Sequence, residues 1–191
     1  MYHAISRKSV VRVPPDRLGE GYEEVVSQLA RNQIEGRLDN EGNMIVMIYD
    51  VALDGNGRVV HGDGGVFQSI SYEALLFSPA VQEVVDAHVV DVIEFGAFLR
   101  FGPFDGLLHI SQIMDDKLDV DEGGKRIVGK ETKRDLKVGD KVRARIISVS
   151  LNEKSPKDSR IGLTTRQPGL GKFEWIEEDR SKKSKKGEVV A

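Results

Sequence analysis

Residues 94–111 read EFGAFLRFGPFDGLLHIS and hold four of the seven phenylalanines in the chain. The rings recur at every third position, at Phe95, Phe98, Phe101 and Phe104. That spacing would suit a helix, but Gly96, Gly102 and Pro103 oppose one, because glycine and proline are the weakest helix formers. The segment therefore predicts short strands joined by tight turns.

The faces of these strands decide what the rings can do. In a flat strand Phe95 and Phe98 would point to opposite faces. A bulge at Gly96-Ala97 would insert one residue and return both rings to one side. We then expect Phe95 and Phe98 to lie near His109 on the outer face of adjacent strands. The side chains that turn inward would be Leu99 and Phe101.

A row of cations accompanies the rings. Basic and apolar residues alternate in KVRARI, residues 141–146, so the apolar set faces a core and the basic set faces solvent. The basic set is Lys141, Arg143 and Arg145. Aromatic rings stack on bases, at roughly 1–3 kcal/mol per base, and cations meet phosphates. The pattern therefore suggests a platform for single-stranded nucleic acid, although the same rings could pack in a core and the same cations could be an ordinary solvated face.

Short strands and glycine turns fill the second half of the chain. The expected strands are Val84–Ile93, Ala97–Phe101, Leu107–Ile110, Lys141–Val149 and Arg160–Thr164. Five short strands in roughly 85 residues suit a small closed barrel of the OB-fold type. Residues 115–135 read as a long polar loop between the third and fourth strands.

The first half of the chain predicts one helix on a small antiparallel sheet. Apolar side chains recur at three-to-four spacing in residues 19–34, which indicates an amphipathic helix. The expected strands are residues 1–14, Met44–Leu53, a strand starting at Val59-Val60, and Val66–Phe77. A tight turn is expected at residues 54–57. The fold class is therefore α+β.

Strand length and composition change along the sequence and divide the chain into three parts. We expect a first domain over residues 1–80, a barrel domain over 81–180 and a lysine-rich disordered tail over 181–191. The junction falls at Ser78-Pro79, where the strands become shorter. The tail, SKKSKKGEVVA, has four lysines and one glutamate, and such charged segments rarely form a core.

Composition excludes several functions. The net charge is −3, so only local patches can attract nucleic acid. The chain has no cysteine, which removes disulfide and thiolate chemistry. No apolar run is long enough for a signal peptide or a membrane span. A cytoplasmic protein without membrane contact is expected.

The sequence contains fragments of catalytic and metal-binding motifs, but their residue types and spacing do not match the complete motifs. Residues 124–130 begin a phosphate-binding loop pattern, but Glu131 stands where serine or threonine would hold magnesium. The four histidines have no metal-ligand spacing, and the acidic residues at 115–122 lack the spacing of a calcium loop. We expect no catalytic residue, no metal and no cofactor.

Residues Val89–Ile113 resemble the RNA-binding OB domain named after ribosomal protein S-one. In that domain, glycine-flanked phenylalanines precede a Gly-Leu-hydrophobic-His-Ile-Ser motif. The likeness continues through KVGDKVRARIISVS and RIGLT and covers all five expected strands. It implies RNA contacts at Phe95, Phe98, His109 and a basic residue of the fourth strand, Arg143, which Lys141 and Arg145 flank.

The segments VRVPP, GRVVHGDGGVF, HISQIMDD and TTRQPGLGKFEWIEE resemble the E-prime family of archaeal RNA polymerase proteins, the counterpart of eukaryotic polymerase subunit seven, over residues 1–178. The resemblance implies a truncated ribonucleoprotein-like first domain that docks on the polymerase core and pairs with the small helical F subunit of RNA polymerase. It also implies a non-catalytic stalk subunit that aids promoter opening and binds emerging transcript, with the catalytic residues in other subunits.

The same resemblance places the turn of Gly62, Asp63 and Gly64 at the tip that contacts the core, although the turn could be a plain hairpin. Two other functions stay open for the whole chain. One is an assembly module without an RNA role. The other is a translation or RNA-decay factor that carries the same barrel.

Overall fold

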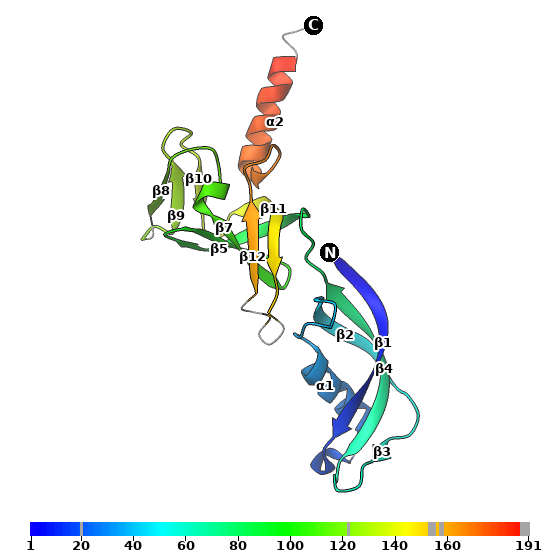
Figure 1. Ribbon diagram of the computed structural model, residues 1–191. Coiled ribbons are helices and arrows are strands. Elements are labelled where there is room, and N and C mark those ends of the chain that lie inside the picture. The colour runs from blue at the N-terminus through cyan, green and yellow to red at the C-terminus, as the bar shows by residue number, and fades with distance from the viewer. Residues whose placement is uncertain (20, 122, 153–155, 157–158, 188–191) are drawn as a thin grey trace. The chain divides into compact units, whose positions relative to one another are not determined.

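The computed structural model describes residues 1–19, 21–121, 123–152, 156 and 159–187. The chain divides into two compact units, Met1–Ser78 and Pro79–Ala191 (Figure 1). The first unit is a helix on a small antiparallel sheet, and the second contains a closed barrel. The expected α+β class is confirmed.

A three-strand path forms the sheet of the first unit. The order is β1–β4–β2, and the short β3 also pairs with β4. The strands are β1 (Tyr2–Val13), β2 (Met44–Leu53), β3 (Arg58–Val59) and β4 (Val66–Phe77). Strand β2 pairs with β4, so the expected tight turn at 54–57 does not join two paired strands. The strand after the turn, β3, pairs with β4 instead, with Arg58 opposite Phe67 and Val59 opposite Val66.

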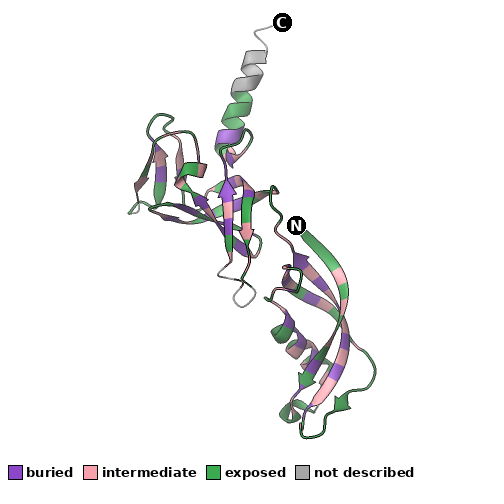
Figure 2. Cartoon of the chain, viewed as in Figure 1, coloured by how far each residue is buried: buried purple, intermediate pink, exposed green. Residues whose placement is uncertain are grey.

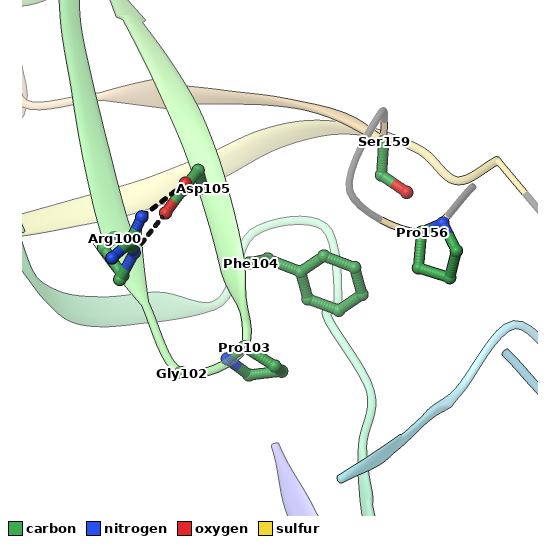
Figure 3. Close-up of a pocket in the computed structure, with 7 residues that line it drawn as sticks. All are labelled: Arg100, Gly102, Pro103, Phe104, Asp105, Pro156 and Ser159. Carbon is green, nitrogen blue, oxygen red and sulfur yellow. Dashed lines mark hydrogen bonds and ion pairs between the residues drawn. The ribbon is translucent and has the colours of Figure 1, made fainter. Parts of the chain in front are cut away.

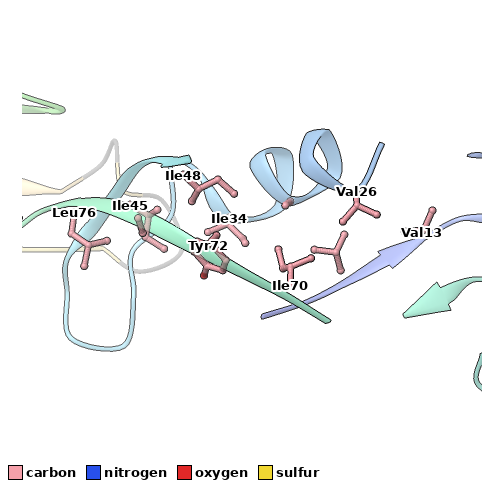
Figure 4. Close-up of a cluster of buried hydrophobic side chains, with 11 residues drawn as sticks. Val13, Val26, Ile34, Ile45, Ile48, Ile70, Tyr72 and Leu76 are labelled. Carbon is pink, nitrogen blue, oxygen red and sulfur yellow. The ribbon is translucent and has the colours of Figure 1, made fainter. Parts of the chain in front are cut away.

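Helix α1 (Tyr22–Ile34) covers one face of this sheet. It starts after Gly21, whose φ of 74° lies in the left-handed region that glycine adopts easily. Val26, Ala30 and Ile34 are buried at four-residue spacing. Val26 and Ile34 face the sheet, where Ile70 is also buried (Figure 4). This apolar stripe gives the unit its own core.

Five strands close the barrel of the second unit. They are β5 (Val84–Ile93), β6 (Gly96–Phe101), β7 (Phe104–His109), β11 (Lys141–Ser150) and β12 (Arg160–Thr164). The order is β12–β7–β6–β5–β11, and a further β12–β11 pairing completes the ring. Strand β12 runs parallel to β7 and antiparallel to β11. All five strands expected from the sequence are present.

A small sheet replaces the polar loop that we expected over residues 115–135. It consists of β8 (Leu118–Asp121), β9 (Arg126–Gly129) and β10 (Asp135–Lys137), in the order β10–β9–β8. Ile127 and Leu136 are buried, so two apolar side chains among many charges suffice to anchor it. The expectation of a loop was wrong because it weighed the charges of this segment above its few apolar positions.

The chain continues through β13 (Gly171–Lys172), which pairs with β11, into helix α2 (Phe173–Gly187). Trp175 and Ile176 are buried at the base of the helix, and residues 177–181, which follow them, are exposed (Figure 2). The helix runs on through Gly187, where the sequence had suggested a disordered tail from residue 181. Lysines near a helix C-terminus and acid–lysine pairs four residues apart favour helix, and residues 188–191 lie outside the described residues.

Candidate nucleic-acid interface

The four phenylalanines divide into two exposed and two buried rings. Phe95 is 52% exposed and Phe98 is 36% exposed, whereas Phe101 and Phe104 are 2% and 3% exposed. The core interpretation therefore holds for Phe101 and Phe104. Phe95 and Phe98 remain available to a ligand.

Strand register places His109 on the same face as Phe98. Gly96 lies opposite His109, and Phe98 lies opposite Leu107 in the β6–β7 pair. Directly paired residues of antiparallel strands point to the same side, so Phe98 and His109 share the outer face. His109 is exposed. We call Phe98 and His109, together with the exposed Phe95 of the turn before β6, the aromatic face.

The expected bulge at Gly96-Ala97 is absent from this hairpin. Pairing is regular from Ile93–Gly96 through Asp91–Phe98, and the register shift falls on β5, between Val89 and Asp91. Phe95 lies in the turn between the paired residues Ile93 and Gly96. The turn, rather than a bulge, gives Phe95 its exposure.

Gly96 permits the close contact between β6 and β7. Its φ is 153°, and a Cβ atom there would lie 2.2 Å from the carbonyl oxygen of Leu108. No other residue fits without moving the backbone that carries His109. The glycine is therefore part of what forms the aromatic face.

The central cation of the predicted basic row already has a partner. Arg143 donates from Nε and Nη2 to Asp86, at 2.7 and 3.0 Å, and its guanidinium stands 5.0 Å from the centre of the Phe173 ring. The hydrogen bond from Arg143 lowers the pKa of Asp86. The charge that Arg143 presents to a phosphate is thus largely neutralised.

Two other basic residues are paired with carboxylates in the same way. Arg100 donates to Asp105 at 2.7 Å, and Lys125 donates to Asp91 at 2.9 Å. Lys141 is exposed opposite His88. Arg145 is half-buried, and its Nε atom has no hydrogen-bond partner among the described residues. Sequence reasoning missed the carboxylates because cross-strand pairing depends on register.

The six predicted RNA contacts do not form one cluster. In the strand register, Arg143 lies opposite Asp86 of β5, and Phe98 lies opposite Asp91 of the same strand. The two β5 positions are five residues apart. At about 3.3 Å per residue, that is roughly 15 Å along the strand. The aromatic face lies toward one end of the hairpin, and Arg143 and Arg145 lie toward the other.

His109 is held in a defined orientation. The backbone N–H of Ser111 donates to His109 Nδ1 at 3.2 Å, and Ser111 Oγ lies 2.8 Å from the same nitrogen. Because Nδ1 accepts a hydrogen bond, the neutral imidazole carries its proton on Nε2. The ring therefore offers an N–H donor away from Ser111.

Residues at the end of β12 form hydrogen bonds with the segment that follows His109. Thr165 Oγ1 donates to the carbonyl oxygen of Ile113 at 2.6 Å, and Thr164 Oγ1 donates to Gln112 Oε1 at 2.8 Å. Arg166 donates from Nη1 to the carbonyl oxygen of Ser111 at 3.3 Å and pairs with Asp115. Hydrogen bonds thus connect the HISQI segment, residues 109–113, to the TTR segment, residues 164–166.

A hollow of about 370 Å³ lies at the opposite end of β6. Gly102, Pro103 and Phe104 line it on one side, and Pro156 and Ser159 on the other (Figure 3). Arg100 and Asp105 at its edge bond to each other. The hollow is separate from the aromatic face, because Gly102 follows β6 and Phe95 precedes it.

The turn predicted to contact a polymerase core is braced within its own unit. Arg12 donates to both oxygens of Asp63, at 2.8 and 2.6 Å, and Gly65 N–H donates to Oδ1 at 2.9 Å. These bonds, with that of Arg12 foremost, lower the pKa of Asp63 to about 2. Gly62 has a φ of 88°. Asp63 therefore shapes the turn that exposes Gly62 and Gly64.

No group of three or more histidine, cysteine, aspartate or glutamate side chains in the described part of the chain could hold a metal ion. No helix in that part is long and apolar enough to cross a membrane.

Two protein families match the chain. Residues 78–160 match the S1 RNA binding domain. Residues 8–64 match the SHS2 domain found in the N terminus of Rpb7p/Rpc25p/MJ0397. The two matches fall on the barrel and on the helix-and-sheet unit.

Relatives match over nearly the whole length. DNA-directed RNA polymerase subunit Rpo7 of Sulfolobus acidocaldarius is 34% identical over 97% of this chain and 100% of its own length. The Saccharolobus shibatae subunit of the same name is 39% identical over 92% of this chain and 97% of its own. Ribonuclease R of Buchnera aphidicola is 38% identical, but over only 37% of this chain and 10% of its own. The likeness to Ribonuclease R therefore covers only part of the chain. The chain belongs to the Rpo7 family of DNA-directed RNA polymerase subunits.

Proposed function

We propose that this chain is a non-catalytic stalk subunit of DNA-directed RNA polymerase that binds emerging transcript on Phe95, Phe98 and His109. One observation carries the proposal. Two exposed rings and an exposed imidazole occupy one end of an S1-type barrel, in a chain that matches polymerase subunits along nearly all its length.

Stacking supplies most of the affinity in this proposal. Each base has a π-face, so rings bind RNA with little regard to sequence, at roughly 1–3 kcal/mol per base. Nε2–H of His109 donates to an acceptor on the RNA. Lys141, Arg143 and Arg145 provide a weaker attraction for phosphates, because Arg143 must leave Asp86 to bind one. Dependence on salt is therefore modest.

The first unit provides attachment in this proposal. It docks on the polymerase core through the turn of Gly62, Asp63 and Gly64, pairs with the F subunit of RNA polymerase, and aids promoter opening. Catalysis takes place in other subunits, and the complex works in the cytoplasm. Support comes from the Rpo7 relatives, which are named as polymerase subunits, and from a turn that Arg12 holds in shape.

RNA binding by the full chain tests the proposal. The double variant Phe98→Ala/His109→Ala should bind a labelled single-stranded RNA at least tenfold more weakly in fluorescence anisotropy, since two contacts are lost. Ile147→Ala is the matched control, because Ile147 is a 40% exposed apolar residue of β11 outside the aromatic face. If the double variant binds RNA as tightly as the unmodified chain, the aromatic face is not the RNA site. If the unmodified chain binds no RNA, an assembly module without an RNA role is the better description.

A further inference from the structure

A second hollow begins at Ile110, the residue directly after His109. It has a volume of about 240 Å³, and its lining includes Ser111, which bonds to the His109 ring. The remaining walls come from η2 (Ile110–Gln112), the residues after it, β8 of the small sheet, and Arg166 after β12. The hollow therefore adjoins His109 of the aromatic face through Ser111. Arg143 lies roughly 15 Å from the level of Phe98, measured along β5.

The walls of this hollow suit a flat, apolar group. Ile110, Met114 and Leu118 line it and are each half-buried. Thr132 Oγ1 lies 3.6 Å from the sulfur of Met114 and steadies that side chain. A planar ring against these side chains would remove apolar surface from water.

The polar groups at the rim disfavour phosphate. Asp116 is already occupied, since it accepts from Thr132 N–H at 2.9 Å and from Thr132 Oγ1 at 2.7 Å. Asp115 is paired with Arg166, and its side chain is 89% exposed. Two carboxylates beside one guanidinium give a net negative rim, which repels a phosphate. The edge of a base can accept from Arg166 and donate to Asp115.

We propose that this hollow holds a nucleobase of the transcript, adjacent in the strand to the bases stacked on the aromatic face. The proposal rests on the proposed function and extends its RNA site by one nucleotide. The transcript then passes from Phe98 over His109 and Ser111 toward β8, rather than along the basic row of β11. The small sheet, which is separate from the barrel sheet among the described residues, forms the far wall of the RNA path.

Methionine provides a direct probe. The chain has four methionines, Met1, Met44, Met47 and Met114, and only Met114 lies in the second unit. The full chain is labelled with ¹³C in its methionine methyl groups and titrated with oligoadenylate. The Met114 methyl signal should shift upfield as a base stacks against it, while Met44 and Met47 stay in place. The shift should saturate with the dissociation constant measured by anisotropy.

A substitution that fills the hollow with a larger side chain provides a second test, which measures oligonucleotide binding. Leu118→Phe should weaken binding of an oligonucleotide long enough to pass His109 by about fivefold, at the low end of what stacking of one base contributes. It should leave binding of a shorter oligonucleotide unchanged. Val120→Phe is the matched control, since Val120 belongs to the same strand and does not line the hollow.

The two failures are distinguishable. An unmoved Met114 signal, with oligoadenylate bound and dependent on Phe98 and His109, overturns this inference and leaves the proposed function standing. If Leu118→Phe does not fold, the Met114 signal of the unmodified chain still decides. If no RNA binds, the proposed function fails, and the inference fails with it.

Discussion

Gly96 has the least freedom to change of any residue at the aromatic face. Its φ of 153° is one that L-residues rarely adopt, and the missing side chain leaves room for the carbonyl oxygen of Leu108. His109 follows Leu108 directly and lies opposite Gly96. A change at Gly96 would therefore displace the histidine as well as strain the hairpin.

Gly96→Ala should lower the free energy of unfolding by about 1–3 kcal/mol, because the added methyl group overpacks the β6–β7 contact. It should also weaken RNA binding by moving His109. Gly139→Ala is the control, since Gly139 has a positive φ of 92° but nothing within 4 Å of the added Cβ. Urea unfolding and anisotropy measure both effects. Equal losses in the two variants would show that backbone conformation, not the close contact, is what matters.

The burial of single residues could be predicted where inward and outward side chains alternate along a strand. The pattern of residues 94–101 correctly turned Leu99 and Phe101 inward and left Phe98 outside. It could not show that Arg143 meets Asp86, because that pair is set by the register of β11 on β5, 57 positions apart in the chain. Exposure follows from local pattern, whereas charge pairing follows from tertiary structure.

Three elements of the second unit meet at one buried cation. Lys172 of β13 is 4% exposed. Its Nζ lies 3.0 Å from Asp140 Oδ2, just before β11, and 2.9 Å from Glu174 Oε2 in α2. Burial alone would lower the pKa of Lys172, but the bonds to Glu174 and Asp140 outweigh it and the pKa is raised. This contact fixes the base of α2 against the barrel.

Lys172→Met should lower the free energy of unfolding of the second unit by about 3 kcal/mol, because it leaves the nearly buried Asp140 without its cation. Trp175, the only tryptophan of the chain, is buried in the first turn of α2 and reports unfolding by fluorescence. Lys137→Met, at an exposed lysine of β10, should change little. Equal stability of the Lys172 and Lys137 variants would contradict this role for Lys172.

The raised pKa of Lys172 also predicts a dependence on pH. A group whose pKa rises on folding stabilises the fold below its unfolded pKa and loses that contribution as pH rises through the folded pKa. The midpoint of unfolding, as reported by Trp175 fluorescence, should therefore decrease as the pH rises above about 10.5. The decrease should be larger in the unmodified chain than in Lys172→Met. Parallel alkaline losses in the two proteins would assign the effect to other groups.

Elements were predictable where apolar residues are dense. The five barrel strands and α1 follow from alternation and from three-to-four spacing. The sheet of β8, β9 and β10 was missed because Ile127 and Leu136 are isolated among charges. The extent of α2 was missed because lysine and serine at its end resemble a disordered tail in composition.

Each unit of the molecule has its own means of stability. Asp39 in the first unit is 9% exposed and accepts from Asn43 N–H at 2.7 Å, Asn43 Nδ2 at 3.1 Å and Arg7 Nη2 at 2.6 Å. Burial would raise the pKa of Asp39, but these bonds together lower it. The second unit has a separate buried core within its barrel.

Asp39→Ala should destabilise the first unit by about 1–3 kcal/mol, because it leaves the donors of Asn43 and Arg7 unsatisfied. RNA affinity and the Trp175 transition should stay unchanged, since both belong to the second unit. Circular dichroism detects the earlier melting of the first unit, and anisotropy measures RNA binding. A matching loss of RNA affinity would show that the two units depend on each other.

Crosslinking within a transcribing polymerase tests the central claim most directly. The chain, carrying a photoreactive phenylalanine at position 98 or at the control position 147, is assembled into the polymerase, and labelled nascent RNA is extended before illumination. The account predicts that position 98 crosslinks to the transcript and that position 147 does not. A transcript that crosslinks at 147 and not at 98, or equally at both, would contradict it.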